Sequence, residues 1–208
     1  SSMATRAKRD GDQWILNGSK RWITNAGIAH LAIVWANTDE GFRGFLVPTN
    51  SEGFEARKIQ NKLSLRASVT GEFYMDDVVV PESMRLPDAT SIGAPLSCLS
   101  EARYGIAFGA VGVARDCYNA ALDYQHGRPQ FGKPLSSFQI NQIKFADMLT
   151  DMTNANLQAM NLGRLKEDHK IRPYHISMAK RHNCRVAIDA ARTARAMMGA
   201  NGVSTEYS

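Results

Sequence analysis

Hydrophobic residues in the first part of the chain come in short runs separated by glycine, asparagine and aspartate, a pattern typical of β-structure up to about residue 86. The segments expected to form strands are 13–18, 22–25, 31–36, 44–48 and 72–80. Asn17-Gly18 is a turn signal at the end of the first strand. Pro81 is expected to end the last one, because proline cannot donate a hydrogen bond to a neighbouring strand. This spacing predicts a small antiparallel β-barrel or β-sandwich domain over residues 1–86.

The pattern changes near residue 87, after which apolar residues recur at the spacing of an α-helix. A first amphipathic helix of about 30 residues is expected to end at Gly127 and Pro129. Its apolar stripe contains Leu96, Leu99, Ile106, Ala110, Val113, Cys117, Ala121 and Tyr124.

Two more helices are expected, over 136–167 and 174–198, with Arg172-Pro173 separating them. The stripe of the second helix contains Phe138, Ile143, Phe145, Met148, Met152 and Met160. Three long helices with short connections predict part of an antiparallel helical bundle over residues 87–208. The fold class is therefore expected to be α+β.

The composition is that of a globular protein, with 44% hydrophobic and 22% charged residues among 208. No apolar run approaches the roughly 18–20 residues that cross a bilayer, so no membrane insertion is expected. No secretory signal is visible, and the chain does not begin with methionine, which suggests that upstream sequence is missing. A net charge of +5, from 25 basic and 20 acidic residues, permits nucleic-acid binding without arguing for it.

The three cysteines are widely spaced and fit neither a disulfide scaffold nor a metal site, which favours a reducing compartment. His175, His182 and Cys184 come nearest to a cluster, and surface or packing roles are favoured for them over metal binding.

Trp22 and Thr24 are the most suggestive pair in the β-region. Residues two apart on an extended segment point to the same side. The indole could therefore stack on a flat ring while the hydroxyl donates a hydrogen bond to the edge of that ring. The alternative is an ordinary strand in which the tryptophan fills the core and the threonine is a β-former.

A second constellation is the loop between the first two predicted helices, residues 128–134 (RPQFGKP). The guanidinium of Arg128 suits a phosphate, because its planar fork gives bidentate hydrogen bonds, and Gln139 could add an amide contact. An arginine that merely ends a helix is the alternative. The small residues 199–202 could let backbone approach a ligand, although helix capping also explains them.

A stripe of four arginines shares one face of the third predicted helix, and this pattern is most often a solvated surface. Its members are Arg181, Arg185, Arg192 and Arg195. The sequence contains no G-x-G-x-x-G, no P-loop motif and no Ser/His/Asp spacing, which disfavours a Rossmann dehydrogenase and a P-loop enzyme.

Taken together, seven segments resemble the acyl-CoA dehydrogenase family, and most closely its glutaryl-CoA dehydrogenase branch. In family order they are 18–25 (GSKRWITN), 62–68 (KLSLRAS), 78–81 (VVVP), 102–106 (ARYGI), 128–132 (RPQFG), 146–150 (ADMLT) and 199–202 (GANG). The resemblance covers the whole chain, and the ordered set is far more specific than any one segment.

The resemblance implies FAD as the cofactor. Trp22, Ile23 and Thr24 would form a wall beside the isoalloxazine, while Arg128 and Gln139 would hold the ADP part of an FAD bound to a neighbouring subunit. The loop that would meet this FAD from the other side contains Ala196, Met197, Met198, Gly199 and Ala200. The chain departs from the family pattern at Ala196, where many relatives carry glutamine, and at Ala200, where many carry glycine.

The resemblance also implies an acyl-CoA segment that ends with Arg103 near the thioester and the flavin. Its residues are Leu96, Ser97, Cys98, Leu99, Ser100, Glu101, Ala102 and Arg103. Removing the proton next to a thioester requires a carboxylate base. The resemblance places that glutamate beyond Ser208, and Ala102 stands where some relatives carry the base instead. Glu101, rotated by about 100° on a helix, and Glu206 are weaker alternatives.

The implied reaction is the oxidative decarboxylation of glutaryl-CoA to crotonyl-CoA, a step of lysine and tryptophan degradation, with electrons passing to an electron-transfer flavoprotein. The resemblance further implies a homo-oligomer, expected to be a tetramer. The bacterial cytoplasm or the mitochondrial matrix is the expected location. The chain alone would be inactive, as a middle and early C-terminal portion of a larger enzyme. The alternatives are another short-chain acyl-CoA dehydrogenase, an acyl-CoA oxidase and, in a different class, a basic helix-rich nucleic-acid-binding module.

Overall fold

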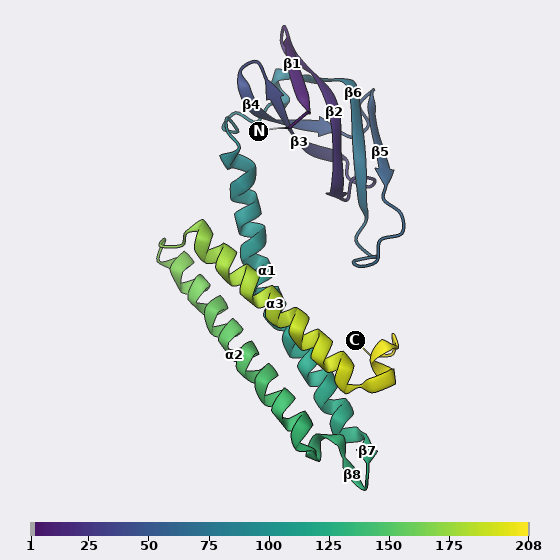
Figure 1. Ribbon diagram of the computed structural model, residues 1–208. Helices are drawn as coiled ribbons and strands as arrows, with labels where there is room; N and C mark the ends of the chain where they lie inside the picture. The colour runs from purple at the N-terminus through teal and green to yellow at the C-terminus, as the bar shows by residue number, and fades with distance from the viewer. Residues whose placement is uncertain (1–2, 208) are drawn as a thin grey trace. The chain divides into compact units, whose positions relative to one another are not determined.

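A computed structural model describes residues 3–207 and divides the chain into two compact units, Ser1–Leu96 and Ser97–Ser208. The first unit is a β-sheet and the second is a set of helices (Figure 1). The predicted boundary between residues 86 and 87 lies in the segment that connects the last strand of the sheet to the first long helix.

The first unit contains the strands β1 (Arg6–Asp10), β2 (Gln13–Thr24), β3 (Leu31–Thr38), β4 (Gly41–Pro48), β5 (Phe54–Lys58) and β6 (Thr70–Pro81), then the short 3-10 helix η1 (Glu82–Met84). They form one sheet of six strands in the order β4-β3-β1-β2-β6-β5. Every neighbouring pair is antiparallel except β1 and β3, which run parallel. The described sheet is therefore mixed, with β4 and β5 at its two edges, rather than a closed antiparallel barrel.

The Asn17-Gly18 pair is not a turn, and the prediction of one here was wrong. The pair lies inside β2 at a β-bulge, where the register with β6 shifts between Leu16 and Gly18. The Asn17 side chain holds the bulge, because its Nδ2 donates to Oδ1 of Asp77 at 2.7 Å and its Oδ1 accepts from the Asp77 backbone N–H at 2.9 Å. Gly18 has φ 135°, and a Cβ there would lie 2.9 Å from the Cα of Thr5.

This bulge explains why odd-numbered residues of β6 face the core before it and even-numbered residues after it. Phe73 and Met75 are buried on one side of it, and Val78 and Val80 on the other. Two residues of β6 lie opposite one residue of β2 at the bulge, so the alternation of side chains restarts one position later. One continuous apolar face results despite the two aspartates between its halves.

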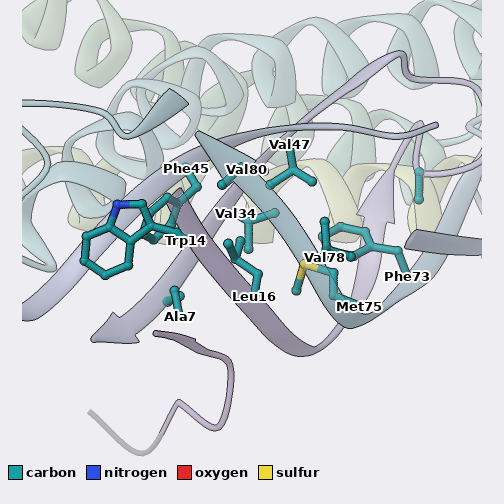
Figure 2. Close-up of a cluster of buried hydrophobic side chains, with 12 residues drawn as sticks. Ala7, Trp14, Leu16, Val34, Phe45, Val47, Phe73, Met75, Val78 and Val80 are labelled. Carbon is teal, nitrogen blue, oxygen red and sulfur yellow. The ribbon is translucent and has the colours of Figure 1, made fainter. Parts of the chain in front are cut away.

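The core of the first unit is built from this face and the matching faces of β1 to β4 (Figure 2). Its largest buried side chains are Trp14, Phe45 and Leu16, and the ring centroids of Trp14 and Phe45 are 5.3 Å apart. Strands β1 and β5 were not predicted. Each is a short polar segment, so no apolar run marked it, and β1 contributes only Ala7 to the core.

The helices are α1 (Gly93–Gly127), α2 (Gln139–Glu167) and α3 (Pro173–Met197), as the spacing of apolar residues predicted. A short hairpin, β7 (Pro129–Gln130) and β8 (Lys133–Pro134), and the 3-10 helix η2 (Leu135–Ser137) join α1 to α2. A further 3-10 helix, η3 (Gly199–Val203), follows α3. None of the helices described is both long enough and apolar enough to span a membrane.

The helices pack through small side chains, so the predicted stripe of α1 is correct at Ala110 and Ala121 and wrong at its larger members. Leu96, Leu99, Ile106 and Val113 are about half exposed. The buried positions of α1 are Ala107, Ala110, Ala114, Ala121 and Gln125. Alanines let helix backbones approach closely, so they occupy the contact face while the larger residues lie on another side.

In α2 the predicted stripe is correct for Phe145 and Met148, which are buried, and for Met152, which packs against them. Ile143 and Met160 are instead about half exposed.

Candidate functional site

Trp22 owes its exposure to another bulge in the pairing of β2 with β6, this time with the extra residue in β2. The inward positions of this strand begin with Trp14 and Leu16, and strict alternation would also turn Trp22 inward. The register with β6 shifts between Arg21 and Ile23, and Trp22 is the extra residue, with φ 61°.

As a result Ile23 packs against the core, while Trp22, 62% exposed, and Thr24 lie outside it. The alternative in which the tryptophan fills the core is therefore wrong.

The Trp22 side chain borders a hollow of about 350 Å³ together with the loop after β5, residues 59–64. The Arg21 guanidinium lies 5.7 Å from the centroid of the indole ring. Lys62 holds the loop, since its Nζ donates to the carbonyls of Leu65 and Ser68 and to Oγ1 of Thr70 at 2.7–2.8 Å. An open indole beside a fixed loop, with a threonine hydroxyl two residues on, can receive the face and edge of a flat ring.

Arg128 follows the end of α1 and is exposed. Its backbone closes the connection to α2, because its N–H donates to the Tyr124 carbonyl and its own carbonyl accepts from Leu135. Gln139, also exposed, is the first residue of α2. Arg128 and Gln139 therefore lie at the two ends of one connection at one end of the helical unit.

The segment 196–200 comes to the same end of the unit, at the turn from α3 into η3 (Figure 1). Met197 and Met198 are buried, so only their backbones could face a ligand, whereas Ala196, Gly199 and Ala200 are exposed. Gly199 has φ 59°, and a Cβ on Gly202 would lie 2.1 Å from the Arg195 carbonyl oxygen. Only glycine fits at position 202, because the chain turns back directly against the helix it has left.

Two neighbouring residues of α1 bind this turn, and neither was among the predicted site residues. Gln125 is 1% exposed, and its Nε2 donates to the Met197 carbonyl at 2.6 Å. The hydroxyl of Tyr124 accepts from Nδ2 of Asn201 at 3.1 Å. A sequence signal for Gln125 existed, because it continues the helical spacing of the buried alanines of α1 at a position where an apolar residue is expected. Arg128, Gln139 and residues 196–200 are therefore brought to one end of the helical unit.

The predicted acyl-CoA segment covers the end of the first unit and the beginning of the second. Leu99 and Arg103, one helical turn apart on α1, are both exposed. Such a surface offers an apolar contact followed by a positive charge. Cys98 and Ala102 are exposed as well.

Glu101 is engaged in a salt bridge with Lys166 of α2, whose Nζ also lies 4.3 Å from the centroid of the Tyr104 ring. The Glu101 carboxylate is already paired with an ammonium group, so Glu101 is a poor candidate for the base. Glu206 is exposed, and its backbone N–H donates to the Ser204 hydroxyl.

The other sequence features singled out are the histidines and the arginine stripe of α3. His175 accepts a hydrogen bond at Nδ1 from the Arg172 backbone N–H and so caps α3. No group of three metal-ligating side chains occurs within residues 3–207. Of the four stripe arginines, all exposed, Arg185 lies 3.6 Å from Asp189, which partly neutralises that face.

Family models match both parts of the chain. The model "Acyl-CoA dehydrogenase, middle domain" matches residues 1–78, and "Acyl-CoA dehydrogenase, C-terminal domain" matches residues 92–208. A probable short/branched chain specific acyl-CoA dehydrogenase of Dictyostelium discoideum is 37% identical over 99% of this chain and 52% of its own length. A glutaryl-CoA dehydrogenase of Desulfococcus multivorans is 35% identical over 99% of this chain and 55% of its own.

Among solved structures, a glutaryl-CoA dehydrogenase of Mycobacterium smegmatis in complex with FADH2 is 51% identical and superposes with a TM-score of 0.97 over 100% of this chain and 54% of that one. The chain thus spans about half the length of the relatives that it matches. Two family models that together match most of the 208 residues, supported by these relatives, give one conclusion: the chain belongs to the acyl-CoA dehydrogenase family.

Proposed function

We propose that these residues form the middle and early C-terminal portion of an FAD-dependent acyl-CoA dehydrogenase of the glutaryl-CoA type. The observation that carries the proposal is the convergence of Arg128, Gln139 and residues 196–200 at one end of the helical unit. Residues 196–200 lie far in the sequence from Arg128 and Gln139, and each segment has groups that a dinucleotide uses. The FADH2 complex of the Mycobacterium smegmatis relative supports FAD as the cofactor.

The donor set fits the ADP part of FAD. An exposed guanidinium suits the pyrophosphate, and exposed backbone at Gly199 and Ala200 with a side-chain amide at Gln139 suits the remaining polar groups. On the other unit, the exposed Trp22 and Thr24 suit the isoalloxazine ring and its edge. In our proposal the two sets come from different subunits, which makes the protein a homo-oligomer, expected to be a tetramer.

FAD, when bound, would supply the acceptor for a hydride from the β-carbon, and a carboxylate would be needed to remove the α-proton. Arg103 would lie near the thioester and help to position it, and Leu99 would contact the acyl-CoA. Because Glu101 is held by Lys166, we expect the base to come from a glutamate outside these 208 residues. The isolated chain should therefore show no dehydrogenase activity.

Glutaryl-CoA is the proposed substrate, with crotonyl-CoA and carbon dioxide as products and an electron-transfer flavoprotein as the electron acceptor. This choice is supported by the relatives of the glutaryl-CoA type, while the short/branched-chain relative supports a second acyl-CoA substrate class. The proposed location is the cytoplasm in a bacterium or the mitochondrial matrix in a eukaryote.

Two measurements on the whole protein test the proposal. Its visible absorbance as purified should show a bound flavin, and its turnover should be faster with glutaryl-CoA than with butyryl-CoA. Faster turnover of butyryl-CoA would assign the protein to the short-chain acyl-CoA dehydrogenases. Rapid oxygen consumption would assign it to the acyl-CoA oxidases. A colourless protein with salt-sensitive DNA binding would instead favour the basic binding module.

A further inference from the structure

We propose that Gln125 is a positioning residue for the cofactor-binding end of the helical unit, an inference that rests on the proposed function. In this view the buried amide sets the position of the backbone that meets the dinucleotide and does not itself touch FAD. It would do so by tying the end of α1 to both the start of α2 and the end of α3.

Both ends of the Gln125 amide are used. Nε2 donates to the Met197 carbonyl at 2.6 Å, and Oε1 accepts from Nδ2 of Asn141 at 2.8 Å. Asn141 also donates to the Leu135 carbonyl at 2.8 Å, so the network extends into the connection that begins with Arg128. A carbonyl at the end of α3 and an amide at the start of α2 are thus held by one side chain that is 1% exposed.

The three segments of the proposed FAD site adjoin this network in the sequence. Arg128 lies one helical turn after Gln125, Gln139 lies two residues before Asn141, and Gly199 lies two residues after Met197. Because a buried hydrogen bond fixes both distance and direction, losing this one would let the three segments shift relative to one another. The proposed cofactor contacts depend on their joint geometry, so a small shift should weaken binding before it disrupts the fold.

Asn183 provides a matched control within the same unit. It is also fully buried and also joins helices, since its Nδ2 donates to the carbonyls of Ala107 and Ala155 at 2.9 and 3.1 Å. It lies fourteen positions before Met197 on α3, which corresponds to about 20 Å along the helix. Loss of its hydrogen bonds should therefore destabilise the bundle without changing the cofactor-binding end.

The experiment compares Gln125→Met and Asn183→Leu in the whole protein, both nearly isosteric. After removal of the flavin, the melting temperature and the dissociation constant for added FAD are measured. Both variants should melt at a lower temperature than the wild type. Gln125→Met should raise the dissociation constant by about tenfold, as expected for a lost buried hydrogen bond, whereas Asn183→Leu should leave it unchanged within about twofold.

A third variant, Gln125→Glu, separates positioning from general loss of stability. A protonated carboxyl can donate to the Met197 carbonyl and accept from Asn141, whereas the ionised form can only accept. FAD binding by this variant should therefore recover towards the wild-type value as the pH is lowered, after correction for the wild-type pH profile. The profile of Gln125→Met should show no such recovery.

The outcomes distinguish this inference from the proposed function. If the wild-type protein binds no FAD, the proposed function is wrong. If the wild type binds FAD and Gln125→Met binds it as tightly as Asn183→Leu does, the positioning role alone is overturned. A Gln125→Glu profile parallel to the wild-type profile contradicts the positioning role in the same way.

Discussion

The indole nitrogen of Trp14 donates a 2.6 Å hydrogen bond to Oε2 of Glu82, 68 residues later in the chain. The other oxygen of the carboxylate lies 2.6 Å from the Arg85 guanidinium. The hydrogen bonds from Arg85 and then from Trp14 lower the pKa of the Glu82 carboxyl from its ordinary value of 4.5. Glu82 therefore joins the core of the sheet to the segment that leads out of it.

This arrangement predicts an acid-dependent loss of stability. A carboxyl whose pKa is lower in the folded state stabilises the fold above its unfolded-state pKa, and the contribution is lost as the pH falls through the folded-state value. Glu82→Gln should lower the free energy of unfolding at neutral pH, and its deficit relative to the wild type should shrink as the pH falls below the ordinary carboxyl pKa of 4.5. Denaturant unfolding at several pH values measures both. Glu52→Gln, at an exposed position, is the control and should show a constant difference from the wild type.

Lys62 should control the loop that borders Trp22. All three protons of its ammonium group are directed to oxygens of residues 65–70, so Lys62→Met leaves these oxygens without that donor. We expect amide hydrogen exchange over residues 59–70 to accelerate by an amount corresponding to about 1–3 kcal/mol of local stability. Lys58→Met changes an exposed lysine at the end of β5 and should leave exchange in the loop unchanged. Equal exchange in the two variants would show that the Lys62 contacts do not hold the loop.

Gly202 should not tolerate a side chain. The added methyl of Gly202→Ala would lie 2.1 Å from the Arg195 carbonyl oxygen, so the backbone after α3 must move. We expect the free energy of unfolding to fall by about 2 kcal/mol or more, as for other strained backbone positions. The matched control is Gly109→Ala in α1, where a Cβ meets nothing within 4 Å. The control should be neutral or stabilising by up to about 1 kcal/mol, since alanine is the better helix former. A similar loss in both variants would contradict the close approach at Gly202.

The helices could be predicted from the sequence because glycine and proline mark several of their boundaries. Gly127 and Pro129 end α1, Pro173 begins α3, and the helices extend between such points with apolar residues at regular spacing. The contact face of α1 could not be predicted in the same way. Small residues bring the helices together there, and a stripe chosen by hydrophobicity finds Ala110 and Ala121 but also selects the larger Leu96, Leu99, Ile106 and Val113, which are about half exposed.

The orientation of Trp22 was beyond sequence reasoning for a related reason. It depends on one extra residue in β2, and the bulge is set by pairing with β6, which lies about fifty residues later. The Gln125 network likewise depends on three elements meeting. Periodicity within one segment carries no information about contacts between elements. A polar residue on an apolar stripe does, however, mark a position where a buried hydrogen-bond partner is needed.

Arg128 should be the strongest single determinant of FAD affinity in the helical unit. In the proposed site its guanidinium binds a pyrophosphate through paired, charge-assisted hydrogen bonds. Arg128→Gln in the whole protein should therefore raise the FAD dissociation constant by about tenfold to a hundredfold, corresponding to about 1.5–3 kcal/mol. The dissociation constant of Arg128→Lys should lie between those of the wild type and Arg128→Gln, since lysine keeps the charge but loses the planar fork. Arg115→Gln removes an exposed arginine from the middle of α1 and should leave FAD binding unchanged. Titration of the flavin-free proteins with FAD measures all four dissociation constants. Equal affinity in Arg128→Gln and Arg115→Gln would exclude Arg128 from the cofactor site, whereas the expected order would assign the pyrophosphate to this end of the helices.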